Sequence, residues 1–273
     1  PKSLNRNRTN LKQQKKKEET KMCTIEKRGS IYFLTLTGPD EHRLNPTLLD
    51  SIHSSLRTLR ETATTSSPCS ALVTAAEGKF FCNGFDLEWA RSAPSRREGL
   101  FRMELMTEKL REIVLELMSL PMPTIAAVTG HAAAGGMPFA LAHDHVAMRR
   151  DRGFMYMSEM DIGMAVPRWF AAVFEGRVGN LRVVREMILA APKLTAEAAI
   201  ERGIVDVAGE GVEGTVAAAV EIAERLVGRG WVGHVYASNR MAVMGDVFEK
   251  VQRFGGSDEG KKNEDLVETT CNA

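Results

Sequence analysis

A long helical segment that runs directly into an apolar strand constrains the fold of this chain more than any other feature. Apolar residues recur at helical spacing over residues 98–120, and Pro121 and Pro123 end the pattern. The next five residues, 124–128, carry no charge and indicate a strand buried on both faces. A strand of this kind needs a covering layer on each face, so the chain is expected to contain an α/β core.

Further strands and helices are predicted on both sides of this segment. They are a hairpin over 23–36 with its turn at 28–30, a helix over 46–60 that begins at Pro46, a strand over 71–74, a helix opening near Gly135, a strand over 146–148, and helices from Pro167 onward with starts near Thr195 and Gly214. Strands that alternate with helices and then give way to helices indicate an α/β core with a helical C-terminal region.

The composition of the 273 residues, 44% hydrophobic and 26% charged, is typical of a globular protein. The four cysteines form no CxxC pair, which argues against a zinc site or a disulfide framework and favours a reducing compartment. No apolar run approaches the roughly 20 residues that a membrane helix needs, and we expect no secretory signal peptide. We therefore expect no membrane partner.

Positive charge is concentrated at the start of the chain. Residues 1–21 hold eight Lys or Arg against two Glu, and the remainder holds 28 against 33 Asp or Glu. The basic stretch has no aromatic residue to stack on a base, so we expect a disordered extension and no nucleic-acid partner. A polar tail is expected over 255–273.

Two glycine-containing turns carry the strongest functional signal. One spans 81–87, with the sequence Phe-Cys-Asn-Gly-Phe-Asp-Leu, and the other spans 130–138, with Gly-His-Ala-Ala-Ala-Gly-Gly-Met-Pro. Each follows a predicted strand and leads into a helix, where free backbone N–H groups are suited to hold a negative oxygen. Each turn alone is also consistent with a simple tight turn, and neither matches a nucleotide-phosphate loop.

Taken together, the two turns resemble the crotonase superfamily, also called the enoyl-CoA hydratase/isomerase family, over most of residues 24–250. The resemblance implies an α/β fold with a crotonase-like ββα spiral core over 22–195, a helical C-terminal trimerisation region over 196–254, and a homotrimer or hexamer. It also implies that the N–H groups of Asn83 and Gly135 form an oxyanion hole for the thioester carbonyl of an acyl-CoA.

The same resemblance implies where the acyl-CoA is bound. Residues 42–46 resemble the family's loop on the CoA side, and 81–87 resemble the other wall. The implied binding residues are Arg43, Leu44, Asn45, Phe81, Asn83, Gly84, Phe85, Asp86, Leu87 and Gly135. Asp86 is also placed to cap the short helix that follows the first turn. No cofactor is implied, because coenzyme A is part of the substrate.

The ionisable residues indicate the type of reaction. Hydratases of this family place two glutamates over the substrate, but this chain has Pro138 at the first position and Glu159 at the second. One carboxylate suits a reaction that removes a proton and returns it on the same face, such as moving the double bond of a 3-enoyl-CoA to the 2-trans position. Asp161 is retained as an alternative base.

Residues 163–170 resemble the corresponding stretch of Δ3,Δ2-enoyl-CoA isomerases, particularly plant peroxisomal ones, which favours an isomerase of fatty-acid β-oxidation. A hydratase, a thioesterase and a non-catalytic acyl-CoA-binding protein stay open as alternatives. The resemblance implies a peroxisomal location, with the cytosol as the alternative because residues 270–273 are not a Ser-Lys-Leu type signal.

Three further sets of residues are candidates for the site. Five methionines either line a dry acyl pocket or belong to the ordinary core: Met137, Met155, Met157, Met160 and Met164. His143 and His145 have no third metal ligand at a spacing typical of metal sites, so no metal is expected. His131 is expected to be structural.

Overall fold

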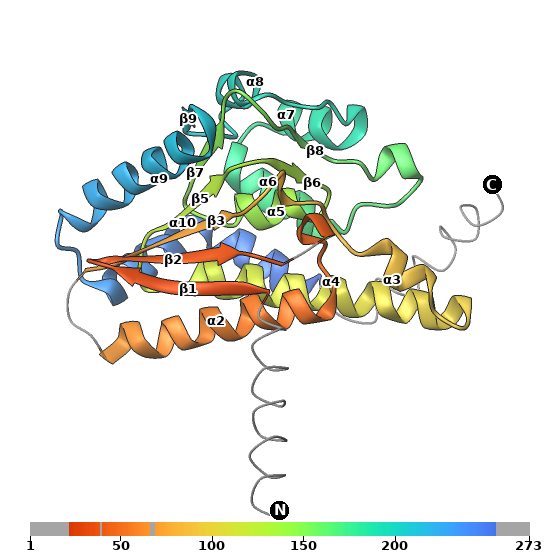
Figure 1. Ribbon diagram of the computed structural model, residues 1–273, viewed down its shortest axis with the longest axis horizontal. Coiled ribbons are helices and arrows are strands. Elements are labelled where there is room, and N and C mark those ends of the chain that lie inside the picture. Colours follow the sequence, from red (N-terminus) through yellow and green to blue (C-terminus); the bar gives the residue numbers. More distant parts are fainter. Residues whose placement is uncertain (1–21, 39, 66–68, 255–273) are drawn as a thin grey trace, which may run out of the picture.

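The computed structural model describes residues 22–38, 40–65 and 69–254, and the expected basic extension and polar tail lie outside them. Its centre is a six-stranded sheet in the order β1-β2-β3-β5-β7-β9 (Figure 1). The strands are β1 (Cys23–Arg28), β2 (Ile31–Leu36), β3 (Ala71–Ala76), β5 (Thr124–Val128), β7 (His145–Arg149) and β9 (Val207–Gly209). Every pairing is parallel except that of β1 with β2. The predicted α/β core is confirmed.

The antiparallel pair β1 and β2 is the predicted hairpin. Arg28 pairs with Ile31 across the turn, and Gly29 has a φ of +60°. A two-residue hairpin turn requires such left-handed backbone, which glycine adopts without steric cost.

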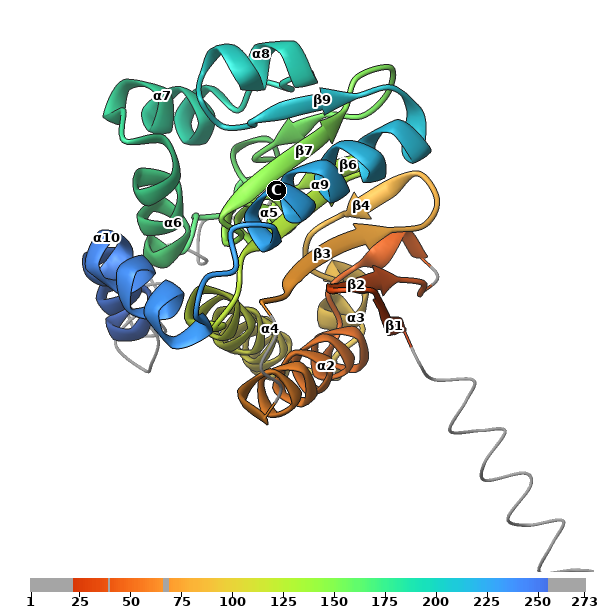
Figure 2. The ribbon, with the colours of Figure 1, turned by 90° about the vertical axis from the view of Figure 1, so that its left-hand side faces the viewer.

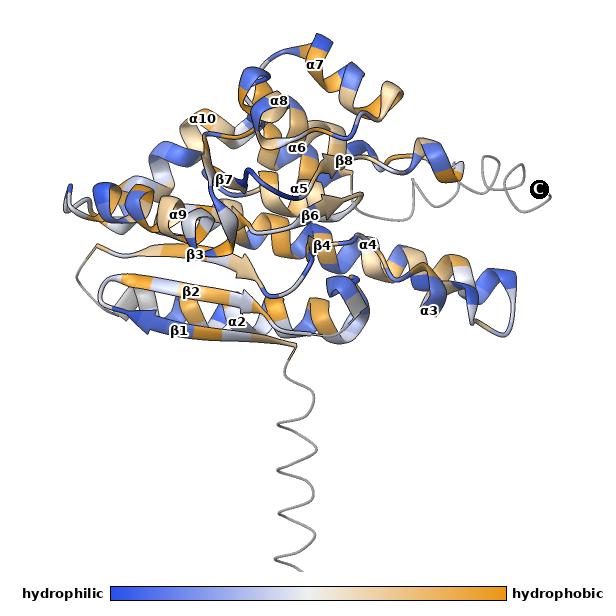
Figure 3. Ribbon diagram, turned by 45° about the horizontal axis from the view of Figure 1, so that its top comes forward, coloured by the Kyte–Doolittle hydropathy of each residue, from blue (hydrophilic) through white to orange (hydrophobic). Residues whose placement is uncertain are grey.

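The predicted helices are present with shifted ends. Helix α2 (Pro46–Thr65) begins at the expected proline, and the Asn45 side chain caps it by accepting the N–H of Leu48 at 3.0 Å. Helix α4 (Arg96–Ser119) is capped by Ser95 and ends before the two prolines. Figure 3 shows apolar and polar residues alternating along α2, as its one-sided burial requires.

Alternate residues of β3 belong to different apolar cores. Leu72 packs in the large core on the face covered by α2 and α4, and Val73 packs in a smaller core under α9 (Gly211–Val227). Figure 2 shows α9 lying across the sheet. Side chains of a strand point alternately to its two faces, so a sheet covered on both sides produces an apolar run without alternation in polarity.

A second, smaller sheet was not predicted. It contains β4 (Phe80–Cys82), β6 (His131–Ala133) and β8 (Met155–Tyr156) in the order β4-β6-β8, all parallel. Sequence analysis assigned the first two segments to turns, because strands of two or three residues are too short to display a period. This sheet carries both glycine turns at the ends of its strands.

The C-terminal part of the chain is mainly helical, as expected, with one short strand among its helices. It contains α6 (Arg168–Val178), α7 (Leu181–Arg185), a π-helical turn (Glu186–Ala190), α8 (Ala196–Glu201) and α10 (Gly233–Arg253). Thr195 caps α8 as predicted, but β9 follows and pairs with β7 in the large sheet. The helical region expected over 196–254 therefore also supplies the edge strand of the large sheet.

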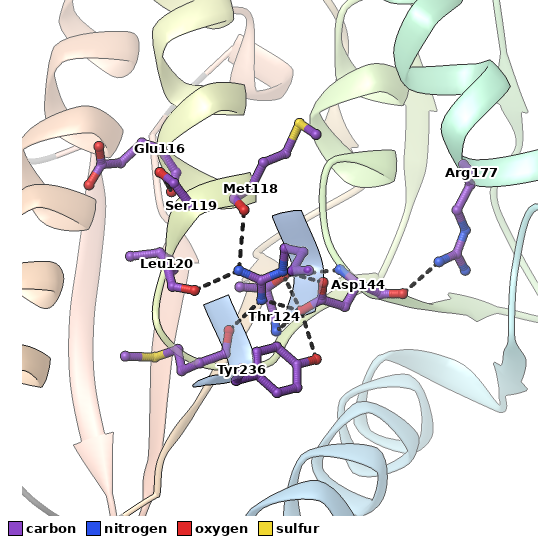
Figure 4. A network of polar contacts seen from close by, with 10 residues as sticks. Glu116, Met118, Ser119, Leu120, Thr124, Asp144, Arg177 and Tyr236 are labelled. Atoms are coloured by element: carbon purple, nitrogen blue, oxygen red, sulfur yellow. Dashed lines mark hydrogen bonds and ion pairs between the residues drawn. The ribbon is translucent and has the colours of Figure 1, made fainter. Parts of the chain in front are cut away.

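A buried ion pair joins α10 to the core (Figure 4). Arg240 donates from Nε to Asp144 Oδ1 at 2.7 Å and from one terminal nitrogen to Oδ2 at 2.5 Å. The same guanidinium donates to the carbonyls of Leu120 and Met122, each at 2.6 Å. Arg240 is 8% exposed. Asp144 thus has a structural role, and Arg240 also satisfies carbonyls that follow the end of α4.

Candidate active site

The two glycine turns, separated by about fifty residues of sequence, touch each other. Gly84 has a φ of +71°, and a Cβ added to it lies 2.8 Å from the Ala134 Cβ and 3.3 Å from the Gly135 nitrogen. A side chain at position 84 is therefore excluded both by the backbone conformation and by the second turn. The close approach places the backbone N–H groups of the two turns in one small region.

The first turn is held by the loop of residues 40–44. The N–H of Leu44 donates to the carbonyl of Gly84 at 2.8 Å, and the N–H of Asp86 donates to the carbonyl of Leu44 at 3.3 Å. These bonds form an isolated parallel bridge between Leu44 and Phe85. In a parallel bridge the flanking residues make the hydrogen bonds, so the N–H of Phe85 points away from Leu44.

The structure corrects the role expected for the N–H of Asn83. This group donates to the carbonyl of Glu41 at 3.2 Å, and the N–H of Gly84 faces the Cys82 thiol. The Asn83 N–H is therefore not free to receive an oxyanion. The N–H of Phe85 has no hydrogen-bond partner among the described residues, and the bridge directs it away from Leu44, so it is an available donor of the first turn.

The second turn leads into α5 (Gly136–Leu141), with Gly135 at the position before the helix. The N–H of Ala134 donates to the carbonyl of Tyr156 at 2.9 Å, and Ala134 has a φ of +48°. A Cβ added to Gly136 lies 2.4 Å from the carbonyl oxygen of Cys82. Only glycine fits at 136, where the turn presses against the end of β4.

Glu159 lies between β8 and a 3₁₀ turn, Met160–Ile162, that begins at the next residue. Its side chain is 5% exposed, and Oε2 has no hydrogen-bond partner within the described part of the chain. Burial raises the pKa of this carboxyl to about 7. A buried carboxyl that shares its proton near neutral pH has the properties of a general acid–base.

The alternative base, Asp161, is exposed to solvent. It lies inside the 3₁₀ turn rather than on a strand. The turn ends at Gly163, whose φ of +67° reverses the chain, and the N–H of Met164 returns to the carbonyl of Glu159 at 2.8 Å. This local fold directs the two carboxylates into different environments and favours Glu159.

Apolar side chains surround the second turn. A Cβ added to Gly135 lies 3.3 Å from Leu44 Cδ1, 3.3 Å from Leu110 Cδ2 and 3.7 Å from the Phe85 ring. The Phe85 ring in turn lies 6.3 Å, between centroids, from that of Phe170 on α6. Leu44 and Phe85 thus lie next to Gly135 and give the second turn apolar surroundings.

The methionines divide into buried and exposed ones. Met137, Met155 and Met157 are at most 1% exposed, whereas Met160 is 52% exposed. Met164 is half-buried. The hypothesis that all five line one dry pocket is therefore wrong for Met160, because the 3₁₀ turn carries it to the surface.

Several residues expected to contact the acyl-CoA have structural partners. Asn45 caps α2, and Asp86 caps the short helix α3 (Leu87–Arg91) by accepting the N–H of Trp89 at 2.9 Å. Leu87 is the first residue of that helix and is half-buried. Phe81 is fully buried, with its ring 5.7 Å from that of Phe139. Because helix caps and buried rings have little freedom, these residues have structural roles in the wall of the first turn.

Arg43 forms an ion pair with Glu41 at 3.0 Å. Glu41 was not singled out by sequence analysis. It accepts from the Asn83 side-chain amide at 2.6 Å in addition to the bond made by its carbonyl. No local sequence pattern identifies Glu41, because its partner at 83 is brought to it only by the fold.

The model of the family described as enoyl-CoA hydratase/isomerase matches residues 26–242. The chain belongs to the enoyl-CoA hydratase/isomerase family. Two relatives from Arabidopsis thaliana are similar over most of their length. Enoyl-CoA delta isomerase 1, peroxisomal, is 49% identical over 83% of this chain and 91% of the relative. Enoyl-CoA delta isomerase 2, peroxisomal, is 46% identical over 81% of this chain and 92% of the relative.

Solved structures of this family have the same fold. The crystal structure of a probable enoyl-CoA hydratase, EchA3, from Mycobacterium tuberculosis H37Rv superposes with a TM-score of 0.78. It is 21% identical, and the match covers 91% of this chain and 98% of the other. The crotonase-like fold expected from the two turns is confirmed.

Neither a metal centre nor a membrane helix is found in the part of the chain that the structure describes. No group of three or more His, Cys, Asp or Glu side chains in that part is arranged to hold a metal ion. No described helix is both long enough and apolar enough to cross a bilayer. His143 Nδ1 instead donates to the carbonyl of Phe139 at 3.1 Å, and Nε2 accepts the hydroxyl of Thr74 at 2.8 Å.

Proposed function

We propose that this chain is an enoyl-CoA isomerase that converts a 3-enoyl-CoA into a 2-trans-enoyl-CoA, with Glu159 as the only proton carrier. The observation that carries the proposal is the buried Glu159 carboxyl, with its unpartnered oxygen and a pKa raised to about 7. Relatives that are 49% and 46% identical are named enoyl-CoA delta isomerases.

The reaction requires one base and one oxyanion hole. Glu159 removes a proton from C2 of the 3-enoyl-CoA, and the electron pair moves onto the thioester oxygen to form a dienolate. The N–H groups of Phe85 and Gly135 stabilise that oxygen, since both belong to the region where the two turns meet. The protonated Glu159 then returns the same proton to C4, and the double bond moves to C2–C3.

Pro138 supports isomerisation over hydration. Hydration of a double bond needs a group that activates water as well as a group that delivers a proton. Pro138 lies in the first turn of α5 and has no ionisable group. Asp161, the first carboxylate after Glu159, is exposed. A hydratase, a thioesterase or a non-catalytic acyl-CoA-binding protein is therefore a weaker interpretation of this site.

We further propose a homotrimer, or a dimer of trimers, that works in the peroxisome. Four apolar side chains at the start and middle of α10 or just before it are exposed: Trp231, Val232, Val235 and Val243. They border a cavity of about 550 Å³ between α6 and α10. An exposed apolar surface of this kind is typical of protein–protein contacts and supports such an assembly. The location rests on the two relatives named peroxisomal.

A turnover assay tests the proposed reaction. The purified protein should convert 3-enoyl-CoA to 2-trans-enoyl-CoA much faster than it hydrates 2-enoyl-CoA. Hydration as the faster reaction would favour the hydratase, release of free CoA would favour the thioesterase, and binding without turnover would favour the non-catalytic protein. Light scattering tests the assembly, and a stable monomer at micromolar concentration would contradict it.

A further inference from the structure

The loop of residues 40–44 contains two consecutive non-glycine residues in left-handed backbone. Glu41 has a φ of 63° and His42 has a φ of 52°. Each such residue costs about 1–2 kcal/mol relative to ordinary backbone, so the conformation persists only where surrounding contacts impose it.

Those contacts fall on the first glycine turn and the strand that leads into it. His42 is 3% exposed, and its Nδ1 makes a 2.9 Å hydrogen bond with the carbonyl of Phe80. Glu41 contacts Asn83 twice, through its carbonyl at 3.2 Å and through Oε2 at 2.6 Å. The strained loop and the turn therefore hold each other in place.

The two contacts of Glu41 determine which N–H group of the first turn stays available. Its carbonyl occupies the N–H of Asn83, and its carboxylate holds the Asn83 side-chain amide against the loop. With position 83 held, the next peptides present the Phe85 N–H on the side opposite Leu44. An oxyanion-hole donor is effective only if its direction is set before the charge develops.

From this arrangement we infer that Glu41 is a positioning residue of the isomerisation site, which acts through Asn83 to orient the Phe85 N–H. The inference rests on the proposed function, because it assumes that the Phe85 N–H binds the thioester oxygen. Glu41 itself does not touch the reacting atoms. Its carboxylate acts as a hydrogen-bond acceptor, so an amide oxygen at the same position should serve nearly as well.

Single and paired substitutions test the role of the acceptor. Glu41→Ala removes it and should lower kcat for 3-enoyl-CoA about tenfold, as expected for one lost hydrogen bond to a charged group. Glu41→Gln keeps an acceptor and should stay within about threefold of wild type. Asn83→Asp sets two carboxylates against each other and should lower kcat about tenfold. Adding Glu41→Gln to Asn83→Asp restores a donor and acceptor pair and should recover most of the loss.

A spectroscopic readout separates positioning from a general structural effect. When a dienoyl-CoA binds, hydrogen bonds to its thioester carbonyl shift its ultraviolet band to longer wavelength. The shift should decrease in Glu41→Ala and in Asn83→Asp and return in the double variant. Glu26 supplies the matched control. It forms an exposed ion pair with Arg28 at 2.9 Å, and Glu41 likewise pairs with an arginine two residues later, Arg43. Glu26→Ala should change neither kcat nor the band.

The outcomes distinguish this inference from the proposed function. If wild type does not isomerise 3-enoyl-CoA, the proposed function fails, and the inference fails with it. If wild type is active and folded Glu41→Ala keeps its kcat and its band shift, only the positioning role is overturned. Should Glu41→Ala not fold, Asn83→Asp and its pairing with Glu41→Gln decide the question, because an unrecovered double variant also contradicts the inference.

Discussion

The carbonyl oxygen of Tyr156 accepts the N–H of Ala134 at 2.9 Å. This bond joins β8 to the turn that contains Gly135, and Glu159 follows Tyr156 by three residues. The proposed base and the proposed oxyanion hole are therefore presented by neighbouring strands of the same small sheet. Their relative position depends on backbone hydrogen bonds rather than on flexible side chains.

Replacing Glu159 with Gln should abolish most of the isomerase activity. Gln has nearly the same size but does not accept a proton, so kcat should fall by about 10²–10⁴-fold. Binding of acyl-CoA should be retained, because the proposed oxyanion hole consists of backbone N–H groups. Steady-state kinetics and calorimetry measure the two effects. Asp161→Asn is the control, and an equal loss of rate in that variant would refute the assignment of the base.

The rate should depend on pH through Glu159. Burial raises the pKa of this carboxyl to about 7, so the ionised form that removes the C2 proton becomes dominant only above that pH. We expect kcat to rise as pH passes through about 7 and then to level off, with the residual rate of Glu159→Gln lacking this step. A profile of kcat from pH 5 to 9 measures it, and a midpoint near 4.5 would show that the acting carboxyl is solvent-exposed.

The same residue should lower the stability of the folded protein at alkaline pH. A carboxyl whose pKa is higher in the folded than in the unfolded state binds more protons when folded, so stability decreases as pH rises from the ordinary glutamate pKa of 4.5 to the raised pKa of about 7. The loss should reach up to about 3 kcal/mol, and Glu159→Gln should not show it. Denaturant unfolding at pH 5 and pH 8 compares the two proteins. An equal change in the free energy of unfolding between the two pH values in both proteins would contradict the burial of an ionisable Glu159.

Two glycines with similar backbone angles should respond differently to alanine. Gly29 has a φ of +60° with nothing within 4 Å of an added Cβ, and Gly84 has a φ of +71° with Ala134 Cβ at 2.8 Å. Gly29→Ala should cost about 1–2 kcal/mol of stability and leave activity unchanged. Gly84→Ala should cost more and should also reduce kcat, because the turns must separate. Unfolding curves and turnover together test this, and equal effects at both positions would contradict it.

Removing Arg240 should destabilise the fold strongly. Arg240→Leu leaves the Asp144 carboxylate without its ion pair and leaves the carbonyls of Leu120 and Met122 without their donor. Loss of one partner of a buried pair costs about 3–5 kcal/mol. The exposed pair of Arg28 with Glu26 is the comparison, and Arg28→Leu should cost less than about 1 kcal/mol. Chemical denaturation measures both, and similar costs would show that the Arg240 pair is no stronger than a surface one.

Local patterns were sufficient for the long elements of the fold. The apolar period of α4, the prolines after it and the uncharged run of β5 identified a helix and a buried strand because each acts within one segment of chain. The same holds for the cap at Thr195 and for the hairpin turn at Gly29. The strands of the small sheet were not predicted, because a strand of two or three residues is too short to show a periodic pattern of apolar residues.

The sequence by itself determined the residue types that this chemistry needs: glycine at 84 and 135, a carboxylate at 159 and a proline at 138. Only the tertiary structure decided which groups are available. Burial of Glu159 and exposure of Asp161 depend on how the chain turns after β8. The engagement of the Asn83 N–H depends on Glu41, forty-two residues away in sequence. Burial and long-range hydrogen bonds arise between segments that meet only in the folded chain, and for that physical reason no local pattern encodes them.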